Sequence, residues 1–130
     1  MKKILTIMAT FATCLTLNAA QVFTSGDFYA PCNTGSKDCR FNLSLELDFD
    51  GDTVSGKIIN MIGIKTCQWA DVPLKGSINP ANEVFWKSEI NPVKGCGRLI
   101  FNGKKDGEKI YGNFPSFQGK QVDINLIPKK

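Results

Sequence analysis

The chain has 130 residues, of which 42% are hydrophobic, 16 are basic and 12 are acidic, giving a net charge of +4. This charge is weak, and the chain has two arginines, Arg40 and Arg98. The protein therefore lacks the strongly basic surface of a nucleic-acid-binding protein. The chain contains no histidine, which removes the Ser-His and Cys-His catalytic arrangements. We therefore expect a protein that is not an enzyme and that needs no cofactor.

The first twenty residues have the pattern of a signal peptide. Two lysines near the start precede a mostly apolar run at residues 4–17, and small residues follow at 18–20. That run is short for a bilayer-spanning helix, which needs ~20 apolar residues, and no other stretch approaches this length. The sequence predicts a signal peptide over 1–20 and one periplasmic or secreted domain over 21–130, with no membrane span.

Cys14 lies inside this predicted signal peptide. A lipoprotein signal has a small residue directly before its cysteine and usually leucine three positions before it, and Thr13 and Phe11 fit those places poorly. We therefore expect no lipid anchor at Cys14.

Alternating apolar and polar residues dominate the rest of the chain. In residues 41–49 every second side chain is apolar without a break, which is typical of a strand with one buried face. Turn residues follow at Asp50-Gly51-Asp52, and similar turns occur at Asn79-Pro80-Ala81-Asn82 and Asp106-Gly107. The pattern predicts strands around residues 22–29, 41–49, 54–58, 72–78, 84–88, 99–101, 110–114 and 122–126.

These elements predict an all-β, single-domain antiparallel up-and-down meander of about eight strands. Eight strands are the number at which a small up-and-down β-barrel closes, and a two-sheet β-sandwich is the alternative. In strand count and turn rhythm the arrangement resembles avidin-like and lipocalin-like barrels. That resemblance is one of architecture, and the sequence motifs of those families are not found, so it assigns no binding residue.

Glycine recurs in the middle of four predicted strands, at Gly26, Gly56, Gly76 and Gly112. Each has an expected inward residue two positions before and after it. Because glycine weakens a strand, this recurrence predicts bends that close a tight barrel, or room for a bulky neighbour or a ligand. The aromatic residues expected on the inward face are Phe41, Phe49, Trp86, Phe101 and Phe114.

The cysteines outside the signal peptide all fall at one end of the predicted barrel. Connections after the first, third, fifth and seventh strands share that end, and they contain Cys32, Cys39, Cys67 and Cys96. An even number of cysteines in an exported chain indicates disulfides. We predict Cys32–Cys39 and Cys67–Cys96, because this pairing closes one local loop and ties two loops that are two strands apart. A zinc site would need all four thiolates, and the chain has no C-x-x-C motif, so we expect no metal.

Candidate binding residues lie in the same loops. Trp69 follows Cys67 and stands near Asp71, and Phe117 and Gln118 lie in the last connection at that end. A loop tryptophan is either an exposed binding residue or a plug over the barrel end. We expect a non-catalytic binding module that presents this disulfide-tied end to a protein partner, as an inhibitor or an envelope-assembly factor does. The alternative is a carrier of a small apolar ligand bound in the barrel mouth.

Overall fold

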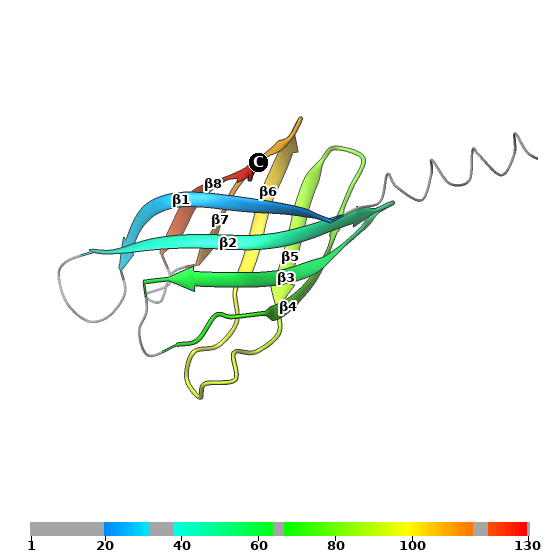
Figure 1. The fold of residues 1–130 in the computed structure, drawn as a ribbon. Helices are drawn as coiled ribbons and strands as arrows, with labels where there is room; N and C mark the ends of the chain where they lie inside the picture. The colour runs from blue at the N-terminus through cyan, green and yellow to red at the C-terminus, as the bar shows by residue number, and fades with distance from the viewer. Residues whose placement is uncertain (1–19, 32–37, 64–66, 116–119, 130) are drawn as a thin grey trace, which may run out of the picture.

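A computed structural model of the protein describes residues 20–31, 38–63, 67–115 and 120–129. Each strand pairs antiparallel with the next along the chain, and the last returns to the first, so the sheet closes into a barrel (Figure 1). This confirms the predicted up-and-down barrel over the two-sheet sandwich. The strands are β1 (Gln21–Pro31), β2 (Asp38–Asp50), β3 (Thr53–Ile62), β4 (Val72–Ile78), β5 (Glu83–Ser88), β6 (Ile100–Asp106), β7 (Lys109–Pro115) and β8 (Gln121–Pro128).

The alternating pattern of the sequence becomes the inner and outer faces of the barrel. In β2 the side chains of Phe41, Leu43, Leu45 and Leu47 are buried, and those between them are half-buried. The indole of Trp86 stacks on the ring of Phe101 with 5.3 Å between ring centroids. Four of the five aromatic residues expected inside are buried, and the fifth, Phe49, is half-buried. Hydrophobic burial on this scale is the main stabilising contribution to such a domain.

Strand β1 departs from the predicted pattern at a β-bulge. Its pairing with β2 shifts register between Thr24 and Asp27, and Gly26 within the shift has a φ of 65° and is exposed. The extra residue reverses the facing of the strand, so Phe23 before it and Ala30 after it are both buried. The inward position expected for Gly26 is therefore wrong, because a bulge and not a barrel bend requires this glycine.

The other three repeated glycines face inward at close contacts between strands. A Cβ atom at Gly56 or Gly76 would collide with a main-chain carbonyl oxygen of the neighbouring strand. At Gly112 a Cβ would also lie 2.7 Å from the ring of Phe101. These glycines thus allow close strand approach, which was not predicted, and Gly112 also makes room for a bulky neighbour, which was.

The two ends of the barrel differ, as predicted. One end carries the short connections, at residues 51–52, 79–82 and 107–108. The other carries the four long ones, at 32–37, 63–71, 89–99 and 116–120, and is called the loop end below.

The barrel closes through a short contact between its first and last strands. β1 and β8 pair at Phe23–Pro128 and Thr24–Ile127, whereas β2 and β3 pair along most of their length. One further hydrogen bond runs from the N–H of Lys129 to the carbonyl of Val22, at 2.8 Å.

No helix in the described part of the chain is long and apolar enough to cross a membrane.

Candidate functional site

The loop end is held together by a disulfide between its second and third connections. Cys67 and Cys96 are bonded, with 5.8 Å between their Cα atoms, which confirms this half of the predicted pairing. Cys39, at the start of β2, is also disulfide-bonded. Its predicted partner, Cys32, lies outside the described residues, so the pairing of Cys32 with Cys39 stays a prediction.

A buried asparagine joins the same two connections. Asn91 is 3% exposed, and its side-chain amide donates a hydrogen bond of 2.7 Å to the carbonyl of Gln68. Its side-chain oxygen accepts a bond of 2.8 Å from the N–H of Val93. The N–H of Asn91 donates to the carbonyl of Gly97 at 2.7 Å. Because a buried amide must satisfy its polar atoms, these bonds fix the fold of the connection after β5.

Trp69 is buried beneath this end and belongs to the barrel core. Its side chain is 4% exposed, so the first of the two predicted alternatives, an exposed binding residue, is wrong. The physical reason is that the open end of a barrel needs an apolar cover, and a large indole close to a disulfide supplies one. The other predicted role, a plug over the barrel end, agrees with this burial. Its indole Nε1 has no hydrogen-bond partner among the residues that the structure describes.

Asp71 stands at the surface of the same connection. Its carboxylate lies 3.2 Å from the ammonium of Lys57, and the Asp71 side chain is 71% exposed. The backbone has a φ of 55°, and the N–H donates to the carbonyl of Ile59 at 3.2 Å. Asp71 therefore ends the connection against β3 and remains accessible to a partner. Phe117 and Gln118 lie outside the described residues.

The most exposed hydrophobic side chains of this end were not among the residues predicted from the sequence. Tyr29, Ile62 and Ile90 are 62–65% exposed, more than any other large hydrophobic residue in the described ranges. Tyr29 lies near the end of β1, Ile62 is the last residue of β3, and Ile90 follows β5. The signal for Tyr29 was available, since Phe28, two residues after Gly26, was expected on the inward face, which puts its neighbour Tyr29 on the outward face. No such signal was available for Ile62, because β3 shifts register against β2.

Tyr29 and Ile62 share the outer face of β1, β2 and β3 with polar residues between them. Tyr29 is paired with Arg40, and Ile62 with Asn42. The guanidinium of Arg40 lies 3.9 Å from the carboxylate of Asp27, which also accepts a hydrogen bond of 3.0 Å from the amide of Asn42. We name Tyr29, Arg40, Asn42 and Ile62 the loop-end patch.

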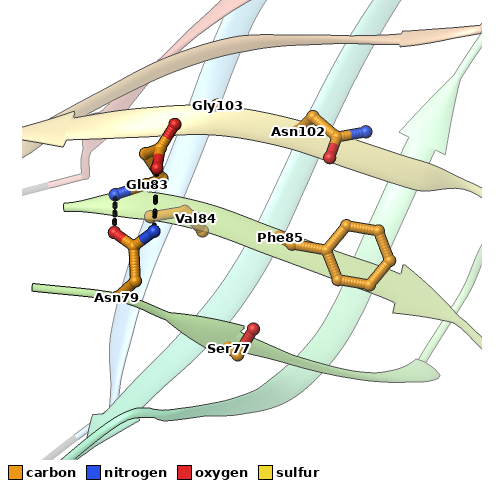
Figure 2. A pocket seen from close by; sticks show the side chains of 7 residues that line it. All are labelled: Ser77, Asn79, Glu83, Val84, Phe85, Asn102 and Gly103. Atoms are coloured by element: carbon orange, nitrogen blue, oxygen red, sulfur yellow. Dashed lines mark hydrogen bonds between the residues drawn. The ribbon is translucent and has the colours of Figure 1, made fainter. Parts of the chain in front are cut away.

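A second feature lies on the outer face of the barrel, away from the disulfide of the loop end. A hollow of about 290 Å³ opens on the outer face of β4, β5 and β6. Figure 2 shows Phe85 and Asn102 beside each other in it, with Asn79 and Glu83 toward the turn between β4 and β5. Its lining residues are Ser77, Asn79, Glu83, Val84, Phe85, Asn102 and Gly103.

Among the described residues, no three histidine, cysteine, aspartate or glutamate side chains gather to hold a metal ion.

Comparisons of the chain with models of protein families, with curated proteins and with solved structures found no match. A functional assignment therefore rests on the chemistry of the two surfaces described above.

Proposed function

We propose that the protein is an exported, non-catalytic binding module whose loop end is a protein-interaction surface. The observation that carries this proposal is the position of Tyr29, Ile62 and Ile90, the three most exposed large hydrophobic side chains in the described ranges, at that end. Tyrosine and arginine are enriched among residues that dominate binding energy, and the loop-end patch pairs Tyr29 with Arg40. An inhibitor or an envelope-assembly factor would use such a surface.

The connections at this end are also preorganised. The Cys67–Cys96 disulfide and the bond from Asn91 to Gln68 hold two of them together before any partner arrives. Loops on a rigid scaffold commonly carry function, and preordering lowers the entropy lost on binding. A disulfide is itself typical of exported proteins, which supports a periplasmic or secreted location. Asp71 stands at the rim of this surface, and the role predicted for Phe117 and Gln118 there stays a prediction.

The carrier of a small apolar ligand has less support. The described interior is occupied by large side chains, with Trp86 stacked on Phe101 and both at most 1% exposed. We therefore do not favour a second function of this kind.

The test is affinity capture from a periplasmic extract with tagged, exported protein. We expect a specific captured protein with the unmodified chain, and its loss with Tyr29→Ser combined with Ile62→Ser. The matched control combines Tyr111→Ser with Ile127→Ser, which removes two exposed side chains away from the patch. Thermal denaturation checks that each variant is folded. Capture of the same protein by all three folded chains would contradict the proposal.

A further inference from the structure

The outer face of β4 to β7 carries a row of uncharged polar side chains around an exposed aromatic ring. Strand pairing sets Ser77 opposite Phe85, Phe85 opposite Asn102, and Asn102 opposite Asn113. Residues directly opposite each other in a sheet share one face. The ring of Phe85 is 37% exposed and stands in the hollow of Figure 2 with Asn102 beside it.

A second exposed ring lies on the same face. Tyr111 is 44% exposed, is paired with Lys104, and precedes Asn113 by two residues in β7. Phe85 and Tyr111 are thus separated by two strands sideways and by two residues along them, about 12 Å at ordinary strand spacing. Two rings at this distance can contact two units of one extended chain, but not two edges of a single small molecule.

The side chains between and beside the rings keep their hydrogen-bonding capacity. Within the described residues, Ser77, Asn102 and Asn113 make no side-chain hydrogen bond. The carboxylate of Glu83, at the turn side of the hollow, is oriented by a bond of 2.8 Å from the amide of Asn79. Asparagine is depleted in strands, so its presence at adjacent outward positions of β6 and β7 calls for a reason other than strand stability.

The charges of the hollow restrict its ligand. Its lining contains one carboxylate, from Glu83, and neither lysine nor arginine, so the hollow itself does not suit a phosphate or another anion. Lys104 is paired with both Glu83 and Tyr111, so one cation lies on the way between the two rings. Hydroxyl and amide groups both donate to and accept from hydroxyl groups, a carboxylate accepts from them, and an exposed ring packs against a face of C–H bonds. A pyranose sugar offers both, with hydroxyls at its rim and C–H bonds on its faces.

We propose that this outer face binds a neutral, extended glycan, a chain of β-1,4-linked hexopyranose units. One unit sits in the hollow against Phe85, with hydroxyls bonded to Asn102, Ser77 and the free oxygen of Glu83. The chain crosses β6 toward Tyr111, beside Asn113. This site is separate from the loop-end patch, so the protein can hold a glycan and a protein partner at the same time.

The experiment is calorimetric titration of the full exported protein with cellopentaose and with chitopentaose. We expect at least one of them to bind, and Phe85→Ala to weaken that binding about tenfold, or ~1.4 kcal/mol. Tyr111→Ala and Asn102→Ala should each weaken it as well, so the proposal does not rest on one variant that could lose stability. Tyr29→Ala, which truncates an exposed ring at the loop end, is the matched control and should leave the affinity unchanged.

Several results would overturn this assignment. Binding of neither oligosaccharide, or equal weakening by Tyr29→Ala, removes the site. Equal binding of maltopentaose, whose α-1,4 linkages curve the chain, contradicts an extended ligand. If Phe85→Ala abolishes capture of a protein from extract while the loop-end variants keep it, this face is a protein interface. The loop-end capture depends on Tyr29 and Ile62 and the sugar titration on Phe85, Asn102 and Tyr111, so the two proposals fail independently.

Discussion

The side-chain amide of Asn91 donates a hydrogen bond of 2.7 Å to the main-chain carbonyl of Gln68, across a sequence separation of 23 residues. The donor lies in the connection after β5 and the acceptor in the connection after β3. The Cys67–Cys96 disulfide joins the same two connections. A noncovalent and a covalent tie therefore act in parallel, and each can be removed alone.

Replacing Asn91 with alanine should destabilise the domain by about 1–3 kcal/mol, because it leaves the carbonyl of Gln68 and the N–H of Val93 without these partners in a partly buried place. Urea denaturation measures the loss. Asn60→Ala, at an exposed position of β3, should change stability by less than about 0.5 kcal/mol. Similar effects at both positions would mean that the amide of Asn91 is not structural.

The cysteine pairing can be read directly from protein recovered after export. We expect peptide mapping without reduction to show Cys32 linked to Cys39 and Cys67 linked to Cys96, because the second bond is present and the first closes a short local loop. A peptide that links Cys39 to Cys14 would overturn the first pairing and the predicted cleavage after residue 20. A free thiol at Cys32 would overturn the first pairing alone.

Removing the disulfide with Cys67→Ser and Cys96→Ser together should lower the free energy of unfolding by roughly 3 kcal/mol, mainly by releasing the unfolded chain. The comparison is a denaturant titration of both proteins without reductant. The barrel should still fold, since its strand pairing lies outside the bridged connections. Loss of all strand structure would show instead that the bridge is needed for folding.

The two faces of β2 should respond differently to substitution. Leu45 is fully buried, so Leu45→Asp places an unpaired charge in an apolar core, costs several kcal/mol and should unfold the domain. Glu46→Ala changes a half-buried outward side chain and should cost less than about 0.5 kcal/mol. Circular dichroism and thermal denaturation of both variants make the comparison. Equal losses of stability would mean that the inward and outward faces of β2 are assigned wrongly.

Trp69→Ala should cost about 3–5 kcal/mol, since it removes a buried indole from the core. The fraction that remains folded should bind a loop-end partner normally, because the side chain does not reach the surface. Tyr111→Ala, at an exposed ring, is the control for stability. A small loss of stability with complete loss of binding would return Trp69 to the role of a surface contact.

Much of the fold followed from period-two alternation. In β2, Leu43, Leu45 and Leu47 alternate without interruption, so their facing and the closed eight-strand architecture were predictable. The bulge in β1 was not, because one extra residue at Gly26 reverses the facing of the strand and leaves no periodic signal of its own. Where a register shift occurs, local pattern and tertiary pairing disagree, and pairing decides.

The site was less predictable than the fold, for a related reason. Placement of the cysteines at one end required only the order of the strands. The exposure of Trp69 depended on how its connection folds back over the barrel. The sequence of a connection has no periodic pattern from which that fold can be predicted. Likewise, Phe85 and Asn102 read separately as ordinary outward residues. Only the pairing of β5 with β6 puts them side by side.

The short closure between β1 and β8 bears on how the barrel assembles. Hairpins such as β2–β3 join residues close in sequence, so their loops close at low entropic cost, whereas Phe23 and Pro128 come from opposite ends of the domain. Topology of this kind slows folding, because the chain loses the entropy of closing a long loop before the contacts between distant segments can stabilise it. The meander can therefore form first as an open, curled sheet, and its few clasping bonds at Val22, Phe23 and Thr24 complete the cylinder last.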